Sequence, residues 1–176
     1  AIANGLFIES AGSFEKTQEL VDRIKAKMRE YVAAEIPIMK RNVTTDEAIE
    51  IFRHHRMYEK ERLFRYRRVS RVNLYSIGGF EDYYYGYMVQ NTGYLKYFDL
   101  ILYRDGMMLL LPEQKNPEQV AEFHDREKLF EVLDETESWG RQLEVPTVGA
   151  LDDVICEGKA SELILMQEAL MEKKIG

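Results

Sequence analysis

The sequence contains a single cysteine, Cys156, and no apolar run that approaches the length of a membrane span. One cysteine cannot form an internal disulfide, which favours a reducing compartment. A membrane-crossing helix needs about 18 or more apolar residues in a row, so no membrane partner is expected. Residues 1–7 lack the basic start and long apolar stretch of a signal peptide. We therefore expect a cytoplasmic protein.

Glycine-rich phosphate loops and metal-ligand spacings are also missing. Gly158-Lys159-Ala160 superficially matches the end of a P-loop, but Asp153 stands where that motif requires glycine, so a simple loop before a helix is expected. Histidine is scarce, and the adjacent pair His54-His55 would point apart on a helix. We expect no metal and no cofactor in this chain.

Cys156 has two readings. As a nucleophile it needs a base, and the only histidines are His54, His55 and His124. A single unpaired cysteine more often serves as a small buried apolar residue, which is the expectation adopted here.

Positive charge is concentrated in one segment, although the net charge is −7. A net negative chain does not coat nucleic acid by bulk attraction. Eight basic residues lie between positions 53 and 71: Arg53, Arg56, Lys60, Arg62, Arg65, Arg67, Arg68 and Arg71. A face of Arg62, Arg65, Arg68 and Arg71 could bind phosphate or an RNA backbone. The alternative is structural, with Glu61 and Arg65 paired at i,i+4 on a solvated helix.

Tyrosines gather in the run Tyr83-Tyr84-Tyr85-Gly86-Tyr87. In a strand, Tyr83, Tyr85 and Tyr87 would share one face with Tyr84 opposite, and such a face could stack nucleobases. The alternative is that these rings pack the edge of a sheet.

The hydrophobic pattern predicts an α+β fold, with a mainly antiparallel sheet and flanking helices, because helices stand at both ends and strands lie between them. Helices are expected from Phe14 to Val32 with Ser13 as N-cap, after Thr44, around Tyr58 to Tyr66, after Asp125 and ending at Gly140, and from about Ser161. Strands are expected at Leu6-Phe7-Ile8, at Pro37 to Val43, and from Val69 to Ile77 before the break at Gly78-Gly79. A hairpin is expected where Arg104-Asp105-Gly106 joins two apolar runs, because Asp-Gly suits a tight turn. A loop is expected between Val145-Pro146 and the last helix.

The segment 82–98 resembles the second half of the accessory, editing-type domain of threonyl- and alanyl-tRNA synthetases. That family shows Asp-x-Cys-x-Gly-Pro-His-Val followed by Thr-Gly and a strand. The frame matches at Asp82, Gly86, Val89, Thr92 and Gly93. The order of Asn4-Gly5, the first helix, Pro37 and Thr45-Asp46-Glu47-Ala48 also follows the family, and the resemblance covers roughly the first 110 residues.

The chain departs from the family at its metal ligands. Tyr84 stands at the Cys position and Met88 at the His position, and a phenol with a thioether cannot replace a Cys-plus-His zinc site. The family's other two ligands, a His-x-x-x-His, would lie upstream of Ala1. Metal-dependent editing is therefore not expected.

The remainder of the chain, with Trp139, Val148-Gly149 and residues 168–174, is similar to one branch, the uridine kinase-like proteins. That resemblance implies a synthetase-like domain at 1–150 and a connector at 151–176 leading to a P-loop kinase domain, which would hold ATP and Mg²⁺. The expected partners are that kinase domain and a nucleotide or RNA ligand, and an oligomer is compatible with the sequence.

Three functions follow from this combination. The leading one is a non-catalytic, ligand-binding accessory domain of a uridine (nucleoside) kinase-like phosphotransferase. The second is a metal-independent aminoacyl-tRNA deacylase in which Thr92 or Asp82 helps to hold a water molecule. The third is a pure protein-interaction module that uses a sheet edge or the final helix.

Overall fold

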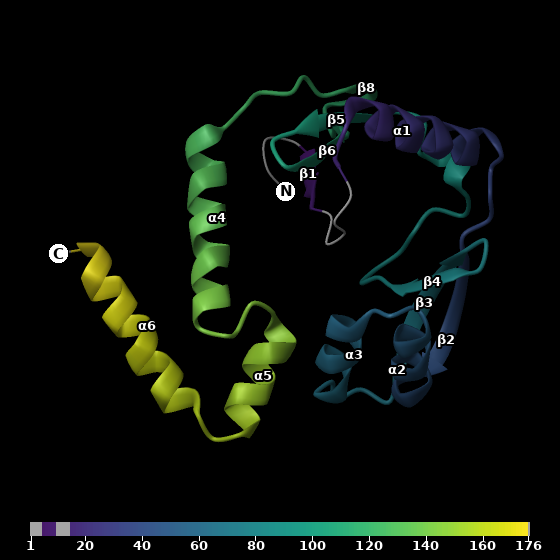
Figure 1. Cartoon of the computed structure of the whole chain (residues 1–176). Helices are drawn as coiled ribbons and strands as arrows, with labels where there is room; N and C mark the ends of the chain where they lie inside the picture. Colours follow the sequence, from purple (N-terminus) through teal and green to yellow (C-terminus); the bar gives the residue numbers. More distant parts are fainter. Residues whose placement is uncertain (1–4, 10–14, 176) are drawn as a thin grey trace. The chain divides into compact units, whose positions relative to one another are not determined.

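The computed structural model describes residues 5–9 and 15–175, with helices and small antiparallel sheets (Figure 1). Three sheets form, with the strand orders β1-β6-β5, β2-β3-β4 and β7-β8. The pairs β1–β6, β5–β6, β3–β4 and β7–β8 are antiparallel. The predicted α+β fold is therefore confirmed. None of the helices in the described part of the chain is long and apolar enough to cross a membrane.

Two compact units make up the chain: Ala1–Met39 with Tyr87–Phe130, and Lys40–Gly86 with Glu131–Gly176. These units group the residues differently from the expected division into 1–150 and 151–176. The expected boundary falls inside the helix α5, and that division stays a prediction.

The first unit is built on a three-stranded sheet and one long helix. Its elements are β1 (Gly5–Ile8), α1 (Gln18–Ala33), the 3₁₀ turn η1 (Thr92–Tyr94), β5 (Asp99–Tyr103), β6 (Gly106–Leu110), β7 (Pro112–Glu113) and β8 (Asn116–Val120). The side chains of β5 and β6 alternate between the two faces of the sheet. On one face Leu100 and Met107 pack with Val21 of α1, and on the other Met108 and Leu110 pack with partly buried aromatic rings. Both faces of this sheet are thus covered.

The second unit packs helices on the sheet β2-β3-β4. Its elements are β2 (Met39–Thr44), α2 (Thr45–His54), α3 (Tyr58–Arg65), β3 (Arg71–Ile77), β4 (Phe80–Tyr83), α5 (Val148–Cys156) and α6 (Ala160–Ile175), while α4 (Glu127–Gln142) begins in the first unit and continues into this one. The core joins Val43, Ala48, Phe52, Phe64, Val72 and Leu74. Phe52 and Phe64 meet edge to face with ring centroids 4.7 Å apart, which holds α2 against α3.

Helix boundaries follow capping chemistry. Thr44 Oγ1 accepts a hydrogen bond from Glu47 N at 3.2 Å, which confirms the predicted start of α2. The first helix begins later than expected, because Thr17 Oγ1 accepts a bond from Leu20 N and so caps α1 at Gln18. The predicted cap, Ser13, lies outside the described residues. Gly140 does not end α4, which continues to Gln142.

The hairpin between β5 and β6 is present, but its turn differs from the expected one. Gly106 pairs with Tyr103 as the first residue of β6, so Arg104 and Asp105 are the central residues, and Arg104 has a φ of +50°. Gly106 is needed for another reason: a Cβ there would lie 2.6 Å from both Ile8 O and the Phe7 ring. Close approach of β1, and not turn geometry, requires this glycine.

Helix α5 occupies the segment that the sequence predicted to be a loop. Thr147 caps it by accepting a hydrogen bond from Ala150 N. Gly149 lies against α3, where a Cβ would stand 3.1 Å from Leu63 N, and Ala150 is buried. Six of its nine residues are apolar and Thr147 offers a cap, but the prediction took Val145-Pro146 as the start of a loop, and the contacts of the helix come from α3, far away in the sequence.

Candidate functional site

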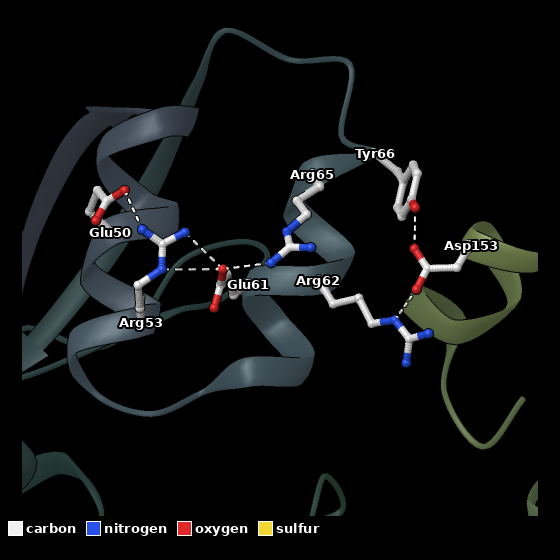
Figure 2. Close-up of polar contacts among 7 residues, drawn as sticks. All are labelled: Glu50, Arg53, Glu61, Arg62, Arg65, Tyr66 and Asp153. Atoms are coloured by element: carbon white, nitrogen blue, oxygen red, sulfur yellow. Dashed lines mark hydrogen bonds and ion pairs between the residues drawn. The ribbon is translucent and has the colours of Figure 1, made fainter. Parts of the chain in front are cut away.

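The basic segment predicted to bind anions folds into helix α3, and much of its charge is neutralised within the second unit (Figure 2). The Glu61 carboxylate, 7% exposed, accepts hydrogen bonds from Arg65 Nη2 at 2.8 Å and Arg53 Nη2 at 2.9 Å. Arg53 also pairs with Glu50 at 2.7 Å. The hydrogen bonds from Arg65 and Arg53 lower the pKa of Glu61 below its ordinary value of 4.5. The predicted Glu61–Arg65 pair is therefore confirmed.

A second cluster ties α3 to α5 (Figure 2). The Asp153 carboxylate accepts hydrogen bonds from the Tyr66 hydroxyl and from Arg62 Nε. The bond to Asp153 raises the pKa of Tyr66 to about 12, because ionisation would place two negative charges side by side. The same bond, with Arg62, lowers the pKa of Asp153. The cluster thus holds Arg62, a predicted anion ligand, against an internal carboxylate.

A third group joins α3 and its C-terminal extension to β4. Lys60 Nζ lies 2.5 Å from both oxygens of Asp82, which is 7% exposed. Arg67 Nη2 donates to the Tyr83 hydroxyl at 2.6 Å, and its guanidinium lies 4.5 Å from the centroid of the same ring. Asp82, the first residue of the resembled motif, is therefore a buried partner of an ammonium group.

The four predicted anion ligands differ in what they contact. Arg62 and Arg65 are paired as described, and Arg71 Nη2 donates to Asn42 O at 2.9 Å. Arg68 is exposed, and its side chain has no partner among residues 5–9 and 15–175. The structure brings these arginines onto one segment without forming one open cationic face. Anion binding by this set stays a prediction.

The tyrosine run does not form the alternating face expected of a strand. β4 ends at Tyr83, and the residues that follow are irregular, with Gly86 at a φ of +98°. Tyr85 and Tyr87 are 94% and 93% exposed, whereas Tyr83 is half-buried against Phe64. The expectation of a shared strand face was wrong because the strand is too short. Ligand contact by these tyrosines stays a prediction.

The residues at the family's metal positions do not fit a zinc site. Tyr84, at the Cys position, is 48% exposed, and Met88, at the His position, offers only a thioether. Within the described residues no three His, Cys, Asp or Glu side chains cluster closely enough to hold a metal ion. His54 and His55 do not point apart as predicted, since their rings meet edge to face 5.3 Å apart.

Two further sequence candidates have different surroundings from those expected. Cys156 is exposed at the end of α5, so the expectation of a buried apolar cysteine was wrong. Thr92 is 4% exposed, and its hydroxyl accepts a bond from Ile36 N at 2.9 Å while donating to Tyr31 O. Thr92 therefore fixes the loop after α1. The Thr-Gly pair of the resembled motif drew attention to Thr92, but it did not reveal this contact.

Beside Thr92 lies a surface pocket that the sequence reasoning missed. Its lining residues are Glu35, Asn91, Gly93, Tyr94 and Lys96. They come from two segments more than fifty residues apart, and no spacing rule in the sequence connects them.

Comparison with known proteins agrees with the resemblance. No family model matches the chain. It is 33% identical over 101 residues to the threonine–tRNA ligases of Paraburkholderia xenovorans (strain LB400) and Paraburkholderia phytofirmans (strain DSM 17436 / LMG 22146 / PsJN). It is 34% identical over 101 residues to that of Burkholderia lata (strain ATCC 17760 / DSM 23089 / LMG 22485 / NCIMB 9086 / R18194 / 383). Each match covers 57% of this chain and 16% of the relative, so the chain matches about a sixth of those proteins. These similarities support a threonyl-tRNA synthetase-like domain in this chain.

Proposed function

We propose that this chain acts as a non-catalytic accessory domain, related to the accessory region of threonine–tRNA ligases and retained for binding. The observation that carries the proposal is the state of Asp82. Both of its oxygens lie 2.5 Å from Lys60 Nζ, and the nearby Tyr84, at the position where the family has a metal ligand, is 48% exposed. The resembled motif is thus retained in part, and the carboxylate of its first residue, Asp82, binds a lysine of the same unit.

The same contacts weigh against the metal-independent deacylase. A general base needs a lone pair within reach of the water that it activates. Asp82 also accepts a hydrogen bond from Tyr83 N at 2.7 Å, so Lys60 and the backbone occupy its carboxylate. The Thr92 hydroxyl is likewise engaged by two backbone groups. Both groups are also buried, at 7% and 4% exposed, which leaves little access for a water molecule.

The parent protein belongs to the same proposal. A uridine kinase-like phosphotransferase would carry ATP and Mg²⁺ in a following domain, and α6 is the segment nearest to it in the chain. Helix α6 exposes Ile164, Leu165, Met166 and Met171, with exposed fractions between 47% and 65%. Exposed apolar side chains in such a group favour contact with another protein surface. Residues 151–176 would then connect the accessory domain to the kinase domain.

A deacylation assay tests the accessory role. The purified chain is incubated with a panel of mischarged aminoacyl-tRNAs, with added Zn²⁺ in one series and a chelator in the other. We expect hydrolysis at the spontaneous rate in both series. Hydrolysis that depends on zinc overturns the proposal. Hydrolysis that persists with the chelator but disappears in Asp82→Asn or Thr92→Ala would instead support the metal-independent deacylase.

The kinase parent has its own test, which is the reading frame that follows the codon for Gly176. We expect it to continue into a glycine-rich loop that ends Gly-Lys-Ser or Gly-Lys-Thr. A frame that continues into synthetase catalytic sequence, or that ends nearby, removes the kinase and leaves the accessory role to be judged by the deacylation assay.

A further inference from the structure

The pocket beside Thr92 has a volume of ≈ 410 Å³ and lies entirely within the first unit. This volume is within the range of about 300–1,000 Å³ that is usual for small-ligand sites. Its walls are the segment that follows α1 and the segment around η1. The pocket is open on one side, which suits a ligand that remains partly exposed to solvent.

Hydrogen bonds hold the two walls in place. Ile38 N donates to Gln90 O at 2.8 Å, and Thr92 N donates to Ile36 O at 3.0 Å. The buried Thr92 hydroxyl adds its bonds to Ile36 N and Tyr31 O. The ligand-facing groups of this pocket therefore stand on a braced scaffold, which lowers the entropy cost of binding.

Glu35 occupies the pocket wall at the expense of backbone strain. It follows the end of α1 with a φ of +48°, in the left-handed region where glycine is the usual residue. Gly93 makes room for it, because a Cβ at position 93 would lie 2.8 Å from Glu35 Cγ. Arg56 after α2 and Glu144 after α4 have a similar positive φ, so the conformation itself is that of a helix end, and the close fit against Gly93 is what distinguishes Glu35.

Most of the polar groups that line the pocket are open to solvent and have no protein partner in the described part of the chain. Among residues 5–9 and 15–175, neither the Glu35 carboxylate nor the Lys96 ammonium has an ion-pair or hydrogen-bond partner. Asn91 Oδ1 accepts from Gly93 N at 2.9 Å, which orients the amide, and its nitrogen has no partner in that part of the chain. Tyr94 is 63% exposed. One anion, one cation, one amide and one aromatic ring thus converge without neutralising one another.

We propose that this pocket binds a nucleoside monophosphate. The Tyr94 ring would stack on the base, Lys96 would pair with the phosphate, and Glu35 would accept hydrogen bonds from the ribose hydroxyls. A simple amino acid would leave the aromatic ring unused, and a metal ion would find one carboxylate only. Stacking is tolerant of the base, so the pocket is specific for the nucleotide unit and not for one nucleobase. This inference rests on the accessory role proposed above and names its ligand, while the deacylation assay tests that role separately.

Titration of the full chain with adenosine 5′-monophosphate tests the proposal, with ¹⁵N-detected amide shifts as the readout. We expect saturable shifts at residues 35 and 91–96. Tyr94→Ala should weaken binding roughly tenfold, whereas the control Tyr58→Ala, an exposed tyrosine on α3, should leave it unchanged. Lys96→Met should bind adenosine 5′-monophosphate and adenosine equally, and Glu35→Gln should lose the preference for ribose over 2′,3′-dideoxyribose.

Glu35→Gly separates function from folding. Glycine relieves the strain at a positive φ, so this variant should melt ~2–4 °C higher while it binds the nucleotide more weakly. Saturable shifts confined to other residues, affinity that is equal in Tyr94→Ala and the parent chain, or binding of a short RNA without binding of the mononucleotide would each overturn the proposal.

Discussion

Two helical glycines should respond to the same substitution with opposite signs. Gly149 lies in the first turn of α5 and faces α3, where an added Cβ would meet Leu63 N at 3.1 Å and Arg62 Cγ at 3.3 Å. Gly140 lies in α4, where an added Cβ finds its nearest neighbour, Val145 O, at an ordinary contact distance of 3.4 Å. The pair isolates the close packing of α5 on α3.

The magnitudes follow from two competing effects. Alanine gains up to about 1 kcal/mol over glycine inside a helix, and less in its first turn. Overpacking a close contact costs about 1–3 kcal/mol. Gly149→Ala should therefore lower the free energy of unfolding by about 1 kcal/mol, and Gly149→Val by more, because its branched side chain reaches further into α3. Gly140→Ala should raise it by about 0.5–1 kcal/mol.

Thermal unfolding measures both variants. Trp139, the only tryptophan, lies in the part of α4 that belongs to the second unit, so its fluorescence reports on that unit, with far-ultraviolet circular dichroism as a second probe. At ~2–4 °C per kcal/mol for a chain of this size, the two alanine variants should differ by about 3–8 °C. Equal stabilisation of both variants would refute the close contact between α5 and α3.

Three further predictions concern titration and packing. Asp153→Asn removes the negative charge beside the Tyr66 hydroxyl, whose bond to Asp153 raises the pKa of Tyr66 to about 12. An absorbance titration should then show that pKa moving towards 10.0, and an unchanged curve contradicts the role of the Asp153 carboxylate. Because the folded pKa is raised, this bond's contribution to stability is complete below pH 10.0 and is lost as pH rises through about 12. Glu61 has a lowered pKa, so its contribution to stability is present above pH 4.5 and is lost as pH falls through the folded value. In Glu61→Gln, the urea concentration at the unfolding midpoint should therefore depend less on pH below 4.5. An unaltered dependence argues against the role of Arg65 and Arg53. Gly106→Ala puts a Cβ 2.6 Å from Ile8 O and should destabilise the first unit by about 3 kcal/mol. The amide hydrogens of β6 should then exchange faster with solvent. Exchange at the rate of the parent chain would show that β1 is not held so closely.

Much of the fold could be predicted because its causes are local. The helical spacing of apolar residues predicted α1, and the capping residue Thr44 predicted where α2 begins. The two apolar runs around Arg104 indicated a hairpin, although Gly106, which was expected in its turn, is the first residue of β6. The α5 helix escaped prediction because Val145-Pro146 was taken as the start of a loop and the packing of α5 against α3 is not visible in the sequence.

The candidate sites show the same division. The resemblance put Tyr84 and Met88 at the family's metal-ligand positions, and residue identity alone says that a phenol with a thioether does not replace a Cys-plus-His pair. It also placed a concentration of positive charge between residues 53 and 71, but a count of charges does not say which of them are neutralised.

The sequence by itself thus determined the α+β class, the principal helices and the chemistry available at each position. Tertiary structure alone decided the partners: Asp153 lies 91 residues from Arg62 in the chain, and Glu35 meets Gly93 although more than fifty residues separate them. The physical reason is that periodicity and capping act over a few residues, whereas ion pairs, burial and pockets depend on which distant segments the hydrophobic core brings together.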